Sequence, residues 1–152
     1  MTDLSQLDAI LGENIRKARM KAGITQIELS RKAGYSDCMV FRWERGKCAP
    51  TRYGIDTICK ILEASAQDMI PKGCCLVGDW DNVDLKKIIE LICLKTGMSI
   101  SKLAEQLEIT RPSICEWKKR YKPSRYATRK ILDLMGVDSV PELVELLEEK
   151  EE

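Results

Sequence analysis

Apolar side chains recur every three or four positions along the first part of the chain, which is the spacing of one face of an α-helix. This opening set ends at Gly23, a residue that readily takes the left-handed conformation with which many helices stop. Thr25 follows, and its hydroxyl can cap a short second helix over residues 26–33. The apolar positions of the opening helix are Leu7, Ile10, Leu11, Ile15 and Ala18.

Further helices are predicted before residue 71. A glycine-led turn and Ser36, a capping residue, precede a third helix over residues 37–45, which Gly46 ends. Thr51, after a proline, can cap a fourth helix, and a short helix is predicted around residues 67–70. No stretch alternates apolar and polar residues for long, so we expect an all-α protein without a sheet. The positions expected to face inward on the fourth helix are Tyr53, Ile55, Ile58, Ile61 and Leu62.

The second half of the chain repeats the first, at an offset of 74 residues up to about Cys48 and of 73 after it. The letters PTRY at residues 50–53 recur as PSRY at residues 123–126. Repetition of this length predicts two related domains. We place them at residues 1–70 and 83–152, joined by a linker, residues 71–82, that is rich in glycine, proline and acids. Identical pairs include Lys21/Lys95, Gly23/Gly97, Leu29/Leu103, Trp43/Trp117, Pro50/Pro123, Arg52/Arg125, Tyr53/Tyr126 and Ile58/Ile131.

The caps and stops of the first half recur in the second. Ser139 and Glu142 form a capping box for an additional last helix over residues 140–149. The apolar stripe of this last helix either packs onto the second domain or serves as the contact of a homodimer. The other helices predicted in the second half are one from about Leu85 to Gly97, one over 100–107 capped by Ser99, one over 111–120 capped by Thr110, and one from Ser124 to Gly136.

Composition narrows the class of protein. The apolar fraction, 44%, suits a globular fold, and no run of about 18 apolar residues predicts a membrane span. The N-terminus lacks a signal-peptide pattern, and seven cysteines without a CxxC pair suit reduced thiols in the cytoplasm. Cys74 and Cys75 could sense redox state or a metal, although accidental thiols are the plainer interpretation. The chain has no histidine, so we expect neither an enzyme nor a metal or other cofactor.

The charge is unevenly distributed, although the net charge is only +1. Residues 15–52 hold ten basic and three acidic residues, and residues 111–130 hold eight basic and one acidic, so each segment carries +7. Acidic residues elsewhere offset both segments. Two basic segments on a nearly neutral chain predict two contacts with a polyanion.

The first half resembles the helix-turn-helix family of phage repressors and Cro-type (XRE-like) regulators. The resemblance covers roughly residues 9–66 and rests on Thr25-Gln26, Leu29, Gly34, the run RWERGK at residues 42–47, and Pro50-Thr51. It implies tandem lambda-repressor-like helix-turn-helix bundles, with the second half as a diverged copy. The copy departs from the pattern at the glutamine (Ile100), at the turn glycine (Glu108) and at the end of the third helix (Lys118-Lys119-Arg120), which leaves room for a second turn of different shape.

In this family the third helix lies in the major groove, so the resemblance implies base contacts from its exposed early positions. An arginine can bind guanine O6 and N7, and a carboxylate can accept a hydrogen bond from cytosine N4. Asp37 can instead cap the helix, and Asp37 and Glu116 can instead orient neighbouring arginines. The implied base-reading residues are Asp37, Cys38, Met39 and Arg42 in the first half and Arg111, Pro112, Ser113 and Glu116 in the second.

The start of the fourth helix lies against the sugar-phosphate backbone in this family, where its N–H groups, its dipole and an arginine favour an anion. On this interpretation the repeated PTRY and PSRY are two phosphate clamps; the plainer interpretation is that each is only a helix start. The two tyrosines either donate a phenolic hydrogen bond or belong to the core, whereas Trp43 and Trp117 are expected in the core. The implied phosphate-binding residues are Gln26, Arg45, Lys47, Thr51, Arg52 and Tyr53, and Lys118, Lys119, Lys122, Ser124, Arg125 and Tyr126.

The leading hypothesis is sequence-specific binding of double-stranded DNA by a small, repressor-like transcription regulator with two tandem helix-turn-helix units. The alternative is a protein-interaction module in which the second unit, or both, no longer bind DNA. Duplex binding that falls steeply with salt distinguishes the first from the second.

Overall fold

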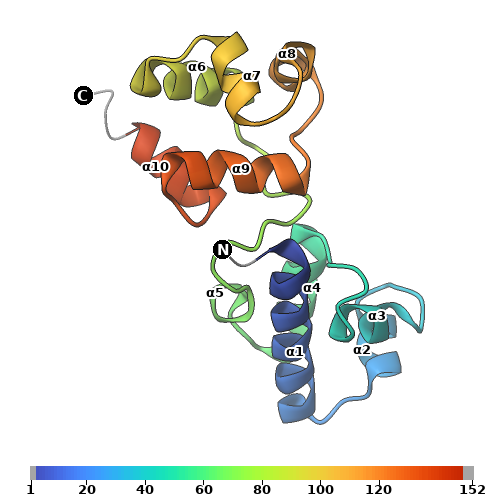
Figure 1. Ribbon diagram of the computed structural model, residues 1–152. Coiled ribbons are helices and arrows are strands. Elements are labelled where there is room, and N and C mark those ends of the chain that lie inside the picture. The colour runs from blue at the N-terminus through green and yellow to red at the C-terminus, as the bar shows by residue number, and fades with distance from the viewer. Residues whose placement is uncertain (1–2, 149–152) are drawn as a thin grey trace. The chain divides into compact units, whose positions relative to one another are not determined.

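The computed structural model describes residues 3–148, which form ten α-helices and no strand (Figure 1). The all-α prediction is confirmed. The chain divides into two packed units, one ending at Gly78 and the other beginning at Asp79. Within the described residues no helix combines the length and the apolar character needed to cross a bilayer.

The first unit is a bundle built around its long opening helix. This helix, α1, packs against α3, α4 and α5, and α2 packs against α3 and α4. The helices are α1 (Leu4–Ala22), α2 (Gln26–Lys32), α3 (Met39–Glu44), α4 (Arg52–Leu62) and α5 (Ala66–Met69).

Three of the predicted helix boundaries of the first unit are confirmed. Gly23 takes the left-handed conformation, with φ 72°, and ends α1. The hydroxyl of Thr25 accepts the N–H of Glu28 at 3.1 Å, and the hydroxyl of Thr51 accepts the N–H of Gly54 at 3.1 Å. These caps satisfy N–H groups that have no partner inside the helix, so α2 and α4 begin where the sequence predicts.

The start of the third helix was predicted wrongly. It begins at Met39 rather than at Asp37, and the Ser36 side chain does not cap it. The N–H of Val40 instead donates to the hydroxyl of Ser30, at 3.1 Å, from the neighbouring helix α2. Ser30 is fully buried and donates in turn to the carbonyl oxygen of Gln26, at 2.9 Å. A buried serine of α2 thus supplies the cap that the local sequence of α3 lacks.

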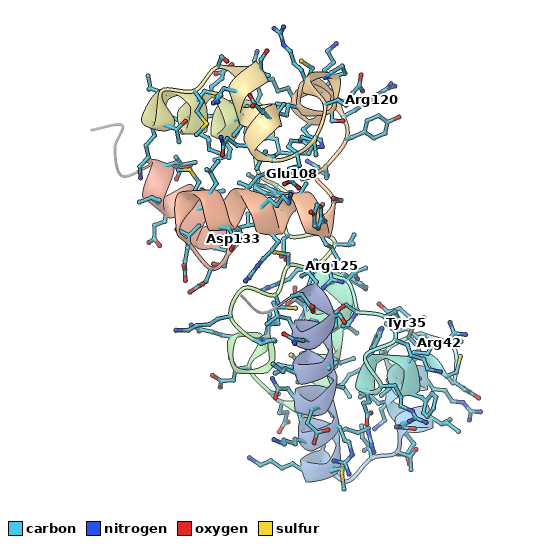
Figure 2. All side chains as sticks on the ribbon, in the orientation of Figure 1. Tyr35, Arg42, Glu108, Arg120, Arg125 and Asp133 are labelled. Carbon is cyan, nitrogen blue, oxygen red and sulfur yellow. The ribbon has the colours of Figure 1, made fainter. Side chains whose placement is uncertain are left out.

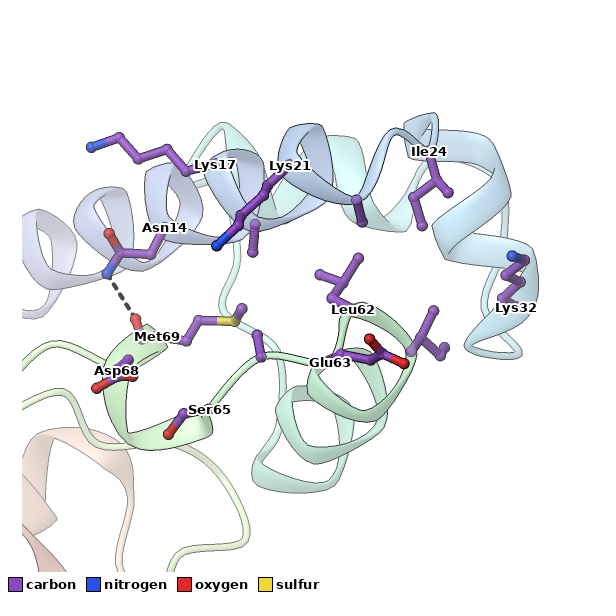
Figure 3. Close-up of a pocket in the computed structure, with 14 residues that line it drawn as sticks. Asn14, Lys17, Lys21, Ile24, Lys32, Leu62, Glu63, Ser65, Asp68 and Met69 are labelled. Atoms are coloured by element: carbon purple, nitrogen blue, oxygen red, sulfur yellow. Dashed lines mark hydrogen bonds between the residues drawn. The ribbon is translucent and has the colours of Figure 1, made fainter.

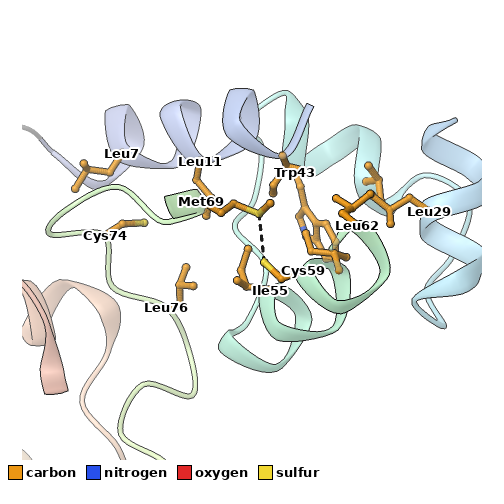
Figure 4. Close-up of a cluster of buried hydrophobic side chains, with 13 residues drawn as sticks. Leu7, Leu11, Leu29, Trp43, Ile55, Cys59, Leu62, Met69, Cys74 and Leu76 are labelled. Carbon is orange, nitrogen blue, oxygen red and sulfur yellow. Dashed lines mark hydrogen bonds between the residues drawn. The ribbon is translucent and has the colours of Figure 1, made fainter. Parts of the chain in front are cut away.

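The core of the first unit confirms the prediction for Trp43, which is 3% exposed (Figure 4). Its ring meets that of Tyr35 edge to face, with centroids 5.1 Å apart. Tyr53, predicted to face inward, is 76% exposed, so that prediction is wrong. Where α1 crosses α3, the backbone at Gly12 lies so close to α3 that an added Cβ atom would clash with the carbonyl oxygen of Trp43.

The second unit has helices in the same order, followed by one more. They are α6 (Leu85–Thr96), α7 (Ile100–Gln106), α8 (Arg111–Lys119), α9 (Arg125–Met135) and α10 (Val140–Glu148). Moving α2 by 74 positions gives the bounds of α7, and moving α4 by 73 gives those of α9. Glu108 has φ 57° and so takes the left-handed conformation. Gly34, its counterpart in the first unit, takes the same conformation, with φ 83°. The second turn therefore keeps the left-handed residue despite losing the glycine.

The remaining caps of the second unit follow the predictions in part. The hydroxyls of Ser99 and Ser124 accept the N–H groups of Lys102 and Ala127, as predicted. Thr110 stands at the N-cap of α8 but makes no capping hydrogen bond with its side chain, contrary to the prediction. As predicted, Trp117 belongs to the core, at 9% exposed.

The apolar stripe of α10 is buried inside the second unit. Val140, Leu143 and Leu147 are each no more than 2% exposed, and α10 packs against α6 and α9. Of the two alternatives for this stripe, packing onto its own domain is the one observed. The hydroxyl of Ser139 accepts the N–H of Glu142 at 3.3 Å, while the Glu142 carboxylate accepts the N–H of Asp138 rather than that of Ser139.

The boundary between the units falls inside the segment expected as a linker, but the segment is packed on both sides of that boundary. Leu76 is buried in the core of the first unit, and the carbonyl oxygen of Val77 accepts the N–H of Arg52 at 2.8 Å. The indole of Trp80 donates to the hydroxyl of Thr128, at 2.7 Å, inside the second unit. The domain bounds proposed from the sequence stay a prediction.

Candidate nucleic-acid interface

The exposed face of α3 carries Phe41 and Arg42, and it continues at the two cap residues, Cys38 and Arg45. Phe41, Arg42 and Arg45 stand three, four and seven positions after Cys38, which is the spacing of one face of a helix, and Val40 and Trp43 occupy the buried face. Arg42 makes no ion pair or hydrogen bond with its side chain to any residue of the described chain (Figure 2). Its guanidinium is therefore available to an external acceptor.

The exposure of the early residues of α3 differs from the prediction at two positions. Met39, predicted to read a base, is half-buried and packs against the core. Phe41, which the sequence analysis did not single out, is exposed at 38% instead. The signal that could have found it is the 3–4 spacing itself, which selects Phe41 once Val40 and Trp43 are assigned to the core.

Asp37 precedes α3 and forms an ion pair with Arg31 of α2. Two hydrogen bonds join the guanidinium to the carboxylate, at 2.9 Å and 3.0 Å, and both residues are exposed. These hydrogen bonds lower the pKa of the Asp37 carboxyl and raise that of Arg31. Among the alternatives for Asp37, the structure places it beside a neighbouring arginine and not at the N-cap, which is Cys38.

Gln26 belongs to a buried polar network that links three helices. Its amide donates to Glu44 at 3.3 Å, and Arg19 binds the same carboxylate with two hydrogen bonds, at 2.8 Å and 3.0 Å. Arg19 also donates to the carbonyl oxygen of Ile24, at 2.9 Å. The side chain of Glu44 is 4% exposed and that of Arg19 13%. The network fixes α1, α2 and α3 relative to one another and turns the Gln26 amide toward Glu44.

The N-terminus of α4 is already partly occupied by the chain itself. The first N–H, that of Arg52, donates to Val77, and the third, that of Gly54, donates to the Thr51 hydroxyl. The Arg52 guanidinium lies 3.6 Å from the Asp56 carboxylate in a half-exposed pair. An anion at this site would therefore rely on the Arg52 side chain and the exposed Tyr53 more than on the first backbone N–H groups.

Arg45 and Lys47, the predicted phosphate-binding residues beyond α3, share one neighbour. The guanidinium carbon of Arg45 lies 5.0 Å from the centre of the Phe41 ring, and the ammonium nitrogen of Lys47 lies 6.0 Å from it. Both cations are exposed.

The base-reading set predicted for the second unit lies along α8. Arg111 and Pro112 are exposed, while Ser113 is half-buried with its hydroxyl 2.9 Å from that of Thr110. The Glu116 carboxylate accepts a hydrogen bond from Arg120 at 3.2 Å, so this acid is engaged with a neighbouring arginine.

The predicted phosphate-binding set of the second unit is partly engaged within the unit. Ser124 caps α9, and Tyr126 is 59% exposed, so this tyrosine is not a core residue. Lys130 stacks over the Tyr126 ring at 4.7 Å and is bonded to Glu108. The hydrogen bond between them lowers the pKa of Glu108 and raises that of Lys130. Among the other members, Lys119 and Lys122 are exposed, and Lys118 and Arg125 are half-buried.

The described residues hold no cluster of ligands that could bind a metal, and the cysteines are free thiols. Cys74 and Cys75 are buried. A groove of the first unit, between α1 and the α4–α5 end, is lined by Lys17 and Lys21 as well as by Glu63 and Asp68 (Figure 3). Lys32 is a third lysine of this lining, so the charged side chains of the groove are three cations and two acids.

Residues 15–64 match the helix-turn-helix family, in its Cro/C1 type, which confirms the resemblance stated for the first half. The match spans the end of α1 and all of α2, α3 and α4. No curated protein and no solved structure matches the chain. The first unit thus carries a helix-turn-helix of the type found in DNA-binding transcription regulators. The second unit lies outside the match.

Proposed function

We propose that the protein is a repressor-like transcription regulator that binds specific sequences of double-stranded DNA through two tandem helix-turn-helix units. The observation that carries the proposal is Arg42, an exposed arginine without a partner in the described chain, on the third helix of the matched domain. An arginine on this helix can form two hydrogen bonds with guanine in the major groove.

The surroundings of Arg42 support a division between base and phosphate contacts. Arg45 and Lys47 follow α3, and Arg52 opens α4, so three cations flank the proposed reading helix. Asp37 is held by Arg31 and acts on this proposal as an orienting group, with Cys38 and Arg42 left to approach the bases.

The second unit supports the tandem part of the proposal through its recurring helix bounds and its Ser–Arg–Tyr helix start at residues 124–126, the counterpart of Thr–Arg–Tyr at residues 51–53. At the offset of 74, Arg111 stands at the position of Asp37, Ser113 at that of Met39 and Glu116 at that of Arg42. Because the two sets differ, the preferred DNA site is asymmetric, with two unlike half-sites rather than a palindrome.

The test is selection of bound duplexes from a random library, followed by titration of the selected site with variants of the full chain. Arg42→Ala is expected to weaken binding by about 1–3 kcal/mol and to relax the preference at one base pair. Arg52→Ala is expected to weaken all sequences alike and to reduce the salt slope. Lys60→Ala, which removes an exposed cation near the far end of α4, serves as the charge-matched control. Equal behaviour of Arg42→Ala and Arg52→Ala would contradict the assignment of the reading helix.

A protein-interaction role for the second unit is the alternative, and a specific observation favours it. Glu116 stands at the position of Arg42 and is paired with Arg120, so the second unit presents an engaged carboxylate where the first unit presents an unpartnered arginine. The discriminating variant is Lys119→Ala/Lys122→Ala in the full chain. Unchanged duplex affinity and salt slope would favour the alternative, and a shallower salt slope would favour DNA binding by the second unit.

A further inference from the structure

Phe41 is an aromatic residue on the exposed face of α3 rather than in the core. It is 38% exposed, whereas Trp43, two positions on, is 3% exposed. A large apolar side chain on an exposed helix face stays in contact with water unless another side chain or a ligand covers it. Within the first unit, the groups over the Phe41 ring are the cations of Arg45 and Lys47.

The local backbone explains how both cations reach the same ring. Arg45 lies four positions after Phe41, which places it one turn farther along the same helix face. Gly46 then takes φ 71°, and the N–H of Lys47 donates to the carbonyl oxygen of Arg42 at 3.0 Å. This turn brings Lys47 back beside the helix instead of letting the chain run on. Arg45 at 5.0 Å is well within the range of a cation–π contact, and Lys47 at 6.0 Å lies at its limit.

We propose that Phe41 is a positioning residue of the DNA-binding face, which holds Arg45 and Lys47 in place for two neighbouring phosphates. This inference rests on the proposed DNA binding and adds a residue that makes no hydrogen bond to DNA itself. Long cationic side chains lose rotamer freedom when they bind, and a contact that restricts them beforehand reduces that loss. Arg42, next to Phe41 in the chain, is left without a partner and faces the bases while its neighbours hold the backbone.

The second unit offers an internal comparison at the same offset of 74 residues. There, Cys115 stands at the position of Phe41, and Lys119 at that of Arg45. The second unit therefore has no ring at this position, and Cys115→Ala is a matched control variant in the same full-length chain.

The experiment measures binding of the selected duplex by fluorescence anisotropy for the full chain and its variants. Phe41→Leu keeps an apolar side chain but removes the ring, and we expect it to weaken binding about two- to fivefold, the equivalent of one exposed cation–π contact. Phe41→Tyr keeps the ring face and is expected to bind like the wild type. In an Arg45→Gln/Lys47→Gln background, Phe41→Leu is expected to change nothing, because the cations it positions are gone. Cys115→Ala is expected to bind like the wild type.

A second readout needs no DNA. In the free protein, the side-chain proton signals of Arg45 are expected to be shifted by the ring current of Phe41, and the shift is lost in Phe41→Leu. Equal weakening by Phe41→Leu in both backgrounds would overturn the proposal in favour of an apolar base contact, and wild-type affinity of Phe41→Leu would overturn it outright. These two results leave the proposed function standing. Absence of specific duplex binding by the wild type would overturn the proposed function and this inference together.

Discussion

The buried network of Arg19, Glu44 and Gln26 makes a quantitative prediction for the stability of the first unit. Arg19→Ala would leave the carboxylate of Glu44, 4% exposed, with the Gln26 amide at 3.3 Å as its remaining hydrogen-bond donor among the side chains of this network. Removing one partner of a buried ion pair typically costs about 3–5 kcal/mol, because the other charge stays buried without compensation. We expect the lower end of this range, about 3 kcal/mol, because Gln26 keeps one hydrogen bond.

For a unit of this size, such a loss lowers the melting temperature by roughly 12 °C or more. The assay is thermal unfolding followed by the indole N–H signals in NMR spectra, because Trp43 reports on the first unit and Trp80 and Trp117 on the second. Only the Trp43 signal should move to lower temperature. The matched control is Arg31→Ala, which breaks the exposed pair with Asp37 and should leave the transition almost unchanged.

The double variant Arg19→Met/Glu44→Met separates a charge effect from lost packing. Replacing both members of a buried pair by apolar residues of similar size is often neutral or stabilising, so the double variant should be more stable than Arg19→Ala. The reasoning is refuted if Arg19→Ala destabilises no more than Arg31→Ala, or if the double variant is the least stable of the three.

Three further predictions concern individual residues of the first unit. Gly12→Ala should destabilise the first unit by about 1–3 kcal/mol in urea unfolding, because the new Cβ would meet the backbone of Trp43 and push α1 from α3. Asp37, whose pKa is lowered from its ordinary value of 3.8, contributes stability above that value that is lost as the pH falls through the folded pKa; because its pair with Arg31 is exposed and this contribution is small, Asp37→Asn should flatten the acid limb of a stability–pH curve only slightly. A maleimide should label the exposed thiols of the native protein well before the buried ones, and equal labelling rates by mass spectrometry would contradict the burial. The exposed thiols are Cys38 and Cys48, and the buried ones are Cys59, Cys74 and Cys75.

Helix boundaries that depend on neighbouring residues could be predicted from the sequence. Thr25 and Thr51 bind N–H groups three positions later, and Gly23 stops α1 by its own conformation. The boundary that failed, the start of α3, depends on Ser30, which lies ten positions before Val40 and belongs to another helix. A capping rule that considers only neighbouring residues selects Ser36. It does not include Ser30, because this serine reaches Val40 through the packing of α2 against α3.

The exposure of the candidate site residues was also predicted only in part. Arg42, Arg45 and Lys47 are exposed as the family resemblance implies, but Met39, expected to be exposed, is half-buried, and Phe41, to which the sequence analysis gave no role, is exposed. At Glu108 the left-handed conformation is kept without a glycine, and the side chain is bonded to Lys130, 22 positions away.

The buried network also bears on how two similar halves avoid exchanging parts while they fold. Tandem repeats in one chain are prone to misassembly, in which a segment of one copy docks into the other. At the offset of 74, Arg19 corresponds to Cys93 and Glu44 to Lys118. If α1 paired with the helices of the second unit, the Arg19 guanidinium would meet an ammonium group in place of a carboxylate, and Glu44 would be left without its arginine. The network therefore makes the pairing of each helix with its own unit much more favourable than either crossed pairing.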